Sequence, residues 1–231
     1  MKPCYRSICI ILVLALNSTI NTYGQPRDVN GIIDSVEARL NRVVDYQANI
    51  EVEVDVDFIK MPVKHATILY KQPDKIKLIS DEFLMLPKRG LGKRVTKILE
   101  EPYTALYLGE DTINGRIQHL IRIVPMGRKP EVILATWWVD TSTFQISRNE
   151  SNLRDGGSFV IDFIYEHKQD ILPKEMVFSF EIEKLNLPLK FIGKSQGIET
   201  DPSEMKPVSQ GKVYLRFSEY RINTGINDEM F

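Results

Sequence analysis

The stretch LATWWVDTSTFQI, from Leu134 to Ile146, decides what kind of sheet this chain builds. It predicts a β-strand that ends in a short bend, and Trp137 and Trp138 are neighbours within it. Neighbouring side chains on a strand point to opposite faces, so one indole must lie on each face of the sheet. A sheet with one dry face and one wet face accommodates only one of them comfortably. The stretch therefore predicts that something other than the sheet covers the second tryptophan.

The chain begins with a segment that is typical of a secretory signal peptide. Lys2 and Arg6 form a basic start, and an apolar run over 8–16 follows that is too short to span a bilayer. Small residues stand at positions −3 and −1 of a cut before Gln25. We expect residues 1–24 to be this leader and residues 25–231 to form a single exported domain, a retained membrane anchor being the alternative.

Charge and cysteine content narrow the class of the exported part. Both cysteines, Cys4 and Cys9, lie in the leader, and Cys9 lacks the small residues expected upstream of a lipid-modified cysteine. Removing the leader from 231 residues leaves 207 without a disulfide, as is common in the bacterial periplasm. The chain has 30 basic and 31 acidic residues, and loss of Lys2 and Arg6 leaves 28 against 31, a net charge of −3. This balance indicates no nucleic-acid partner.

One amphipathic helix is predicted from Val29 to Tyr46. Asp28 or Asn30 can cap its start, and charged residues fill the positions between the apolar ones. The apolar positions that recur at helical spacing are Ile32, Ile33, Val36, Leu40, Val43 and Val44.

The rest of the chain is predicted to be mostly β-strand. NIEVEVDVDFI, from Asn49 to Ile59, alternates apolar and acidic residues almost perfectly. Asn114-Gly115 predicts a hairpin turn within 103–124, and Pro73 predicts a bend within 65–80. Further strands are predicted within 158–167, 174–185 and 211–223, and a loop between 192 and 211. These segments predict about nine or ten antiparallel strands in one α+β, mainly β, domain.

A single helix cannot cover so wide a sheet. A helix is about 10 Å wide, whereas strands lie about 4.8 Å apart, so one helix covers roughly two or three strands. Either the sheet curls on itself around a filled core, or its concave face keeps an apolar hollow under a small lid. The tryptophan pair favours the hollow, with one indole inside it.

Three stretches resemble the periplasmic outer-membrane lipoprotein carriers, the LolA- and LolB-like family. In ATILYKQPDKIKL (66–78), a strand ends in Tyr-Lys-x-Pro-Asp and another strand follows. In WWVDTSTFQI (137–146), an aromatic strand runs into a hairpin. Over residues 29–58, a helix precedes the first strand. The resemblance implies an open antiparallel half-barrel with a helical lid over its concave apolar face. It also implies a non-enzymatic carrier of lipoprotein acyl chains or related lipids, without a cofactor, that has membrane-associated donor and acceptor proteins.

The chain departs from this family's pattern at Gln72. Many of these carriers have an arginine directly before the proline, where it tethers the helical lid. Here Gln72 precedes Pro73, and Lys71 lies one residue earlier, on the opposite face of the strand. We therefore expect lid control to differ from that of the family.

The candidate site residues fall into three sets. The side chains predicted to line the cavity are Trp138, Trp137, Phe144, Phe83, Met85 and Tyr107. The lid helix would present Ile33, Val36 and Leu40. A basic segment suits acidic lipid headgroups or an acidic partner, a solvated loop being the alternative, and its residues are Lys88, Arg89, Lys93 and Arg94.

Other chemistry finds little support in the sequence. The three histidines are far apart, and the usual nucleophile, phosphate and dinucleotide motifs are missing, so we predict no enzyme and no metal. The acidic residues that alternate over 51–57 suit the solvent face of a strand better than a calcium-binding site.

Asn149-Glu150-Ser151 matches a glycosylation sequon that would be inert in a bacterial periplasm. Besides the carrier, an envelope sensor of lipid or lipoprotein on the same half-barrel and an exported structural β-protein stay open.

Overall fold

The structure is a computed structural model that describes residues 28–56, 59–80, 95–154, 157–183, 199–200 and 208–231. The predicted leader lies outside these residues and stays a prediction, as does most of the predicted loop between 192 and 211. The helices in chain order are α1 (Val29–Leu40), η1 (Val95–Leu99) and η4 (Asp228–Met230). The strands are β1 (Asp45–Val56), β2 (Ile59–Lys60), β3 (Lys64–Lys71), β4 (Lys75–Ile79), β5 (Tyr103–Ile113), β6 (Arg116–Pro125), β7 (Val132–Asp140), β8 (Ile146–Leu153), β9 (Ser158–Ile164), β10 (Glu175–Glu183), β11 (Glu199–Thr200) and β12 (Val208–Ile222).

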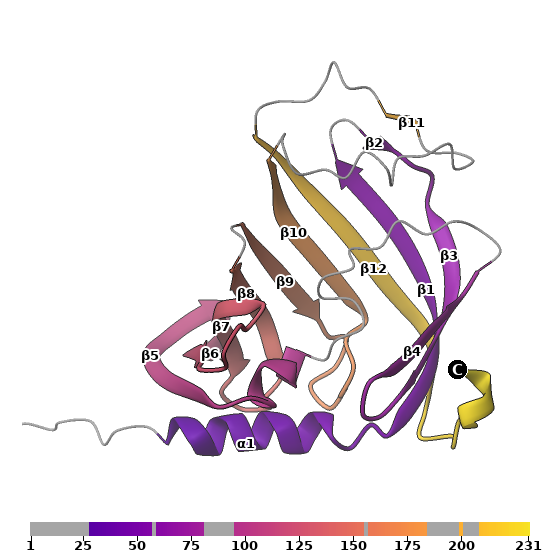
Figure 1. Ribbon diagram of the computed structural model, residues 1–231. Helices are drawn as coiled ribbons and strands as arrows, with labels where there is room; N and C mark the ends of the chain where they lie inside the picture. The colour runs from indigo at the N-terminus through magenta and orange to yellow at the C-terminus, as the bar shows by residue number, and fades with distance from the viewer. Residues whose placement is uncertain (1–27, 57–58, 81–94, 155–156, 184–198, 201–207) are drawn as a thin grey trace, which may run out of the picture.

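All strands belong to one antiparallel sheet that does not close into a barrel. Its order is β11-β2-β1-β12-β10-β9-β8-β7-β6-β5, and β3 and β4 branch from β1. Of the 12 strands in the described residues, β2 and β11 have two residues each. The other ten agree with the prediction of about nine or ten strands. In Figure 1, α1 lies beneath the β5–β8 end of the sheet, and β9, β10, β12 and β1 rise away from it. The predicted fold class, an open half-barrel with a helical lid, is confirmed.

The lid helix starts where the sequence predicts but ends earlier. The Asp28 carboxylate caps it by accepting a hydrogen bond from the Gly31 backbone nitrogen at 3.0 Å. The predicted end at Tyr46 is wrong, because α1 ends at Leu40 and β1 already begins at Asp45. Tyr46 pairs with Ile222 of β12 and with Tyr70 of β3, so pairing on both sides of the strand outweighs the helical spacing of Val43 and Val44.

Two predicted turns set the hairpins. Asn114 and Gly115 have φ angles of 50° and 73° and join β5 to β6, which is the turn chemistry that this pair of residues favours. The bend at Pro73 separates β3 from β4, which pair with each other. Both predictions are confirmed.

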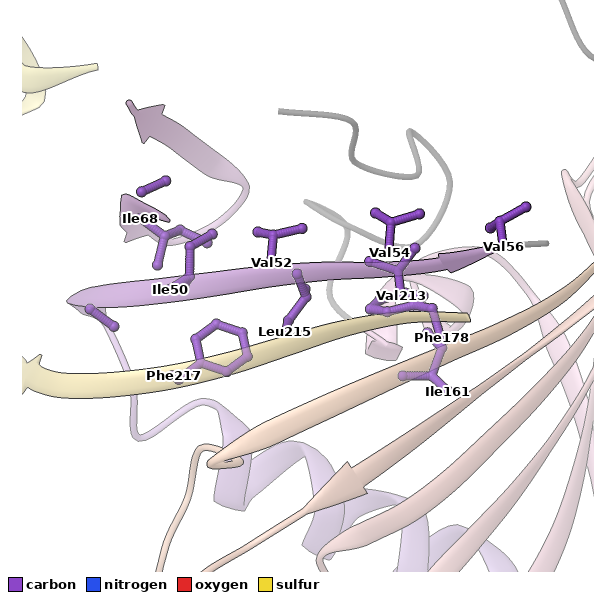
Figure 2. Close-up of a cluster of buried hydrophobic side chains, with 12 residues drawn as sticks. Ile50, Val52, Val54, Val56, Ile68, Ile161, Phe178, Val213, Leu215 and Phe217 are labelled. Atoms are coloured by element: carbon purple, nitrogen blue, oxygen red, sulfur yellow. The ribbon is translucent and has the colours of Figure 1, made fainter. Parts of the chain in front are cut away.

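The alternation in β1 puts its apolar side chains on one face and its acids on the other. Figure 2 shows Ile50, Val52, Val54 and Val56 on the same side of β1, within a cluster that continues through β12, β10 and β9. On the opposite face Arg216 pairs with Glu51 and Glu53 at 2.7 Å each. The acidic residues are thus the solvent face of the strand, as predicted.

A second apolar cluster joins α1 to the other end of the sheet. Ile33 is fully buried, and Ile32 and Val36 lie beside it on α1. The strand residues in this cluster are Ile121, Ile123, Ala135, Trp137, Val139 and Ile146. Burying each such aliphatic side chain stabilises the docked helix by about 1.5–3 kcal/mol, so the first turns of α1 form part of the core.

Candidate functional site

A cavity of about 420 Å³ lies between α1 and the concave face of the sheet. Its walls come from the second half of α1, from η1 and from the inner faces of β1, β3, β4, β7, β8, β9, β10 and β12. The apolar side chains on these walls include Leu40, Trp137, Phe144, Phe159, Phe163 and Met176. The sheet therefore carries more apolar surface than α1 covers.

The two tryptophans lie on opposite faces of the sheet, as their neighbouring positions require. Trp137 is fully buried between α1 and the sheet and lines the cavity. Trp138 lies on the other face, where its indole nitrogen donates to the Asp111 carboxylate at 2.8 Å and the Arg148 guanidinium lies 5.8 Å from its ring centroid. The bond from Trp138 holds the pKa of Asp111 below its ordinary value. Trp138 is thus placed away from the cavity.

The other predicted site residues divide between the cavity wall, its surroundings and the undescribed part of the chain. Val36 and Leu40 of α1 and Phe144 line the cavity, whereas Ile33 lies in the core beneath the helix. Tyr107 packs at the edge of the same core and shares a hydrogen bond with His119 Nδ1 at 3.3 Å. Outside the described residues lie Phe83, Met85, Lys88, Arg89, Lys93 and Arg94.

Arg39 ties the last turn of α1 to two loops across the cavity. Its guanidinium donates to the carbonyls of Thr143 and Lys168 at 3.2 Å each, and to that of Asp170. Desolvation by burial lowers the pKa of Arg39 from its ordinary value. Our sequence reasoning placed this residue among the polar positions of the helix and did not single it out.

The loop that accepts this bond is itself held by a buried carboxylate. Asp140, whose side chain is 2% exposed, accepts hydrogen bonds from the backbone nitrogens of Ser142 and Thr143 at 3.0 and 2.8 Å and forms an ion pair with Arg116 at 2.8 Å. Desolvation raises the pKa of Asp140, but the bonds from Ser142 and Thr143 outweigh it and leave that pKa below the ordinary value. The ionised carboxylate thus shapes the turn that carries Phe144 to the cavity.

Gln72 contacts the segment that follows α1. Its side-chain nitrogen donates to the Val43 carbonyl at 2.9 Å and to the Asn41 carbonyl at 3.4 Å. Its backbone nitrogen donates to the Val44 carbonyl at 2.8 Å. A glutamine therefore links the β3–β4 turn to the lid connection at the position where the resembling family has an arginine.

Tyrosines form one end of the cavity. The rings of Tyr46 and Tyr70 stack with centroids 5.1 Å apart, and Tyr220 meets Tyr46 edge-on at 5.7 Å. The Tyr220 hydroxyl donates to the Pro173 carbonyl at 2.8 Å. Burial raises the pKa values of Tyr46, Tyr165 and Tyr220, so this wall is polar yet uncharged.

Exposed charges stand at the border of the cavity near η1. They are Lys97, Glu100, Glu101, Lys129 and Glu131. Charged side chains at a border and apolar ones within suit a ligand that has one polar and one apolar part. Among the residues that the structure describes, no group of three or more His, Cys, Asp or Glu side chains could hold a metal ion.

Fold and cavity together define an open β half-barrel with one helix over an apolar hollow. This fold matches an outer membrane lipoprotein-sorting protein domain from Vibrio parahaemolyticus with a TM-score of 0.51 and 14% identity, over 86% of this chain and 94% of that one. It also matches a DUF1329 family protein from Desulfovibrio piger with a TM-score of 0.51 and 13% identity, over 88% and 96%. A LolA superfamily protein from Nitrosomonas europaea matches with a TM-score of 0.48 and 13% identity, over 87% and 96%. The first of these matches confirms that the chain shares the fold of a lipoprotein-sorting protein domain, as the resemblance implies.

Sequence comparison adds nothing to this likeness. The chain matches no family model, and no curated protein matches it in sequence. Within the described ranges, no helix combines the length and the apolar character needed to cross a membrane.

Proposed function

We propose that this protein is a non-enzymatic periplasmic carrier that binds acyl chains of lipoproteins or related lipids beneath α1 and passes them toward the outer membrane. The observation that carries the proposal is an apolar cavity roofed by a single helix. The shared fold with a lipoprotein-sorting protein domain supports the same class of cargo. Membrane-associated proteins would deliver and accept the lipid.

The cavity volume bounds how much of a lipid it holds. A water molecule takes about 30 Å³ of liquid, and a methylene group is of similar size, so about 420 Å³ accommodates on the order of 14 groups. Burial of about 0.8 kcal/mol per methylene then contributes on the order of 11 kcal/mol before the costs of association. One acyl chain is therefore enough to give useful affinity.

Release requires α1 to move, since this helix is the roof. Its apolar contacts through Ile33 and Val36 are strong, whereas the bonds of Arg39 go to carbonyls that water can satisfy as well. We propose that the second half of α1 lifts from the cavity when cargo enters or leaves. Hand-over to an acceptor of similar affinity then needs no energy source.

A cavity-filling substitution tests the proposal. Leu40→Trp should place an indole in the space beneath the roof and weaken binding of an apolar fluorophore at least tenfold. Val44→Trp is the matched control, because Val44 is 49% exposed just beyond the same helix. A wild-type protein that ignores the fluorophore would show a filled structural β-protein instead.

A transfer assay separates the carrier from a sensor. Lipids extracted from the natively purified protein are identified by mass spectrometry and then loaded onto the wild-type chain. A carrier passes the loaded lipid to acceptor vesicles, whereas a sensor retains it. Retention of the lipid under conditions where vesicles are in excess would contradict the carrier role.

A further inference from the structure

Two neighbouring rows of side chains cross the concave face of the sheet. The cross-strand register defines the first row as Val54, Val213, Phe178, Ile161, Asn149, Trp137 and Ile121. It defines the second row as Val56, Gly211, Phe180, Phe159, Ser151, Ala135 and Ile123. Every member of both rows is apolar except Asn149 and Ser151, which stand side by side on β8.

This polar pair is buried and faces the cavity. Asn149 is 5% exposed and Ser151 is 3% exposed, and both line the cavity wall. The Ser151 hydroxyl donates to the Asn149 side-chain oxygen at 3.2 Å. Within the described part of the chain, the Asn149 side-chain nitrogen donates no hydrogen bond. Two N–H donors therefore stand on an otherwise apolar wall.

The neighbour of this pair also has an unused donor. Trp137 is directly opposite Asn149 in the register, and its buried indole nitrogen has no partner in the part of the chain that the structure describes. Buried polar groups are nearly always hydrogen-bonded, and leaving one unpaired costs about 1–3 kcal/mol. Apolar residues would build the same strand at lower cost, so folding alone does not account for the pair.

The glycosylation motif does not account for the pair either. Asn149 and Ser151 satisfy the sequon because they are two residues apart, and that same spacing puts both side chains on one face of the strand. The face is the inner one, where a glycan has no room. The motif is thus a consequence of a polar pair that points into the cavity.

We infer that Asn149, whose side-chain oxygen accepts the Ser151 hydroxyl proton, binds through its side-chain nitrogen the carbonyl oxygen that joins an acyl chain to its headgroup. The inference rests on the proposed function and specifies its cargo. A carbonyl oxygen has two lone pairs and no donor, which complements the free N–H groups of Asn149. Held there, the carbonyl places the hydrocarbon chain against the apolar wall around Trp137, Phe159 and Phe163. The site then selects acyl lipids over alkyl lipids of equal length.

A matched pair of lipids tests this inference. Palmitoyl lysophosphatidylcholine and its hexadecyl ether counterpart carry the same headgroup and differ at the carbonyl. Their affinities are measured by displacement of an apolar fluorophore below the concentrations at which they form micelles. We expect the wild-type protein to bind the acyl lipid about tenfold more tightly, which is the effect of about one buried hydrogen bond.

Variants of β8 test whether Asn149 and Ser151 cause the preference for the acyl lipid. Asn149→Leu and Ser151→Ala should each reduce it, and the double variant should bind both lipids about equally. Asn152→Leu is the matched control, because Asn152 lies on the same strand between two residues of the inner face and points to the other one. We expect this control to keep the full preference.

The possible results separate the two proposals. Equal affinity of the wild-type protein for both lipids overturns the inference and leaves the carrier function intact. No affinity for either lipid overturns the carrier function and the inference with it. If Asn149→Leu fails to fold, the wild-type comparison and Ser151→Ala still decide the question.

Discussion

The two halves of α1 differ in what holds them to the sheet. Ile32 and Ile33 of the first half, with Val36 at the start of the second, are buried in a core with β6, β7 and β8. The rest of the second half roofs a cavity. There Leu40 packs only partly buried against the same core, and the hydrogen bonds of Arg39 and, just beyond the helix, of Gln72 hold the end of α1. The difference teaches that one helix can be both a core element and a lid, because apolar packing anchors one half while exchangeable polar bonds close the other.

The largest effect on stability is expected at Ile33. Ile33→Ala should lower the free energy of unfolding by about 3 kcal/mol, because a fully buried side chain leaves a cavity in the packed half. Urea denaturation at neutral pH measures the change.

Leu40→Ala is the matched comparison for Ile33. Leu40 already borders open space, so its truncation should lower the free energy of unfolding by about 1 kcal/mol and weaken fluorophore binding more than Ile33→Ala does. Equal losses of stability at the two positions would contradict the division of the helix into halves.

The second largest effect is expected at Asp140, which shapes the loop that accepts the Arg39 bond. Asp140→Asn should lower the free energy of unfolding at pH 7 by about 2 kcal/mol, because it removes charge-assisted bonds to Arg116 and the turn. The folded-state pKa of Asp140 is lowered, so its contribution is present above the unfolded-state value of about 3.9 and is lost as the pH falls below it.

Denaturation curves at a series of acidic pH values measure this contribution. The wild-type protein should lose stability more steeply than Asp140→Asn as the pH falls from about 5 to about 2. Parallel pH profiles for the two proteins would show that the carboxylate does not stabilise the turn.

A smaller effect on stability, but a larger one on kinetics, is expected at Arg39. Arg39→Met removes bonds to three carbonyls and should lower the free energy of unfolding by about 1 kcal/mol while speeding fluorophore release about fivefold. Stopped-flow dilution measures the release. Arg39→Lys is the control and should restore only part of the slow release, since an ammonium cannot span three acceptors.

The smallest effect is expected at Gln72. Gln72→Ala removes the side-chain bonds to Val43 and Asn41 but keeps the backbone bond to Val44, so the expected loss of stability is about 0.5 kcal/mol. Hydrogen exchange should quicken at the last turn of α1 and stay unchanged near Ile33. Asp74→Ala in the same turn is the control, and faster exchange along the whole helix would contradict two separately held halves.

Local sequence patterns predicted much of the fold, because strand faces, tight turns and helix caps depend on residues that are close together along the chain. Alternation over Asn49–Val56 gave both faces of β1, the Asn114-Gly115 pair gave a hairpin, and Asp28 gave the helix cap. The end of α1 could not be predicted in this way. Val43 and Val44 continue the helical spacing, but the pairing of Tyr46 with strands far along the chain outweighs it.

The site was less predictable than the fold. The sequence named Trp137, Phe144, Val36 and Leu40, which the structure places around one cavity, but it could not tell which indole of the pair points inward. It also offered no reason to single out Arg39, whose acceptors lie more than 100 residues away along the chain. Hydrogen bonds between residues so far apart leave no pattern in the spacing of residues along the sequence.

By itself, the sequence determined that this protein is a wide antiparallel sheet with one apolar face and too few helices to cover it, because periodicity and composition are properties of the chain alone. Only the tertiary structure decided which residues face the hollow, where the lid ends and what holds it shut. Those outcomes depend on which distant strands become neighbours, since a side chain's partners are set by register across the sheet. The sequon at Asn149 shows the point, because only the register reveals it as a polar pair in an apolar wall.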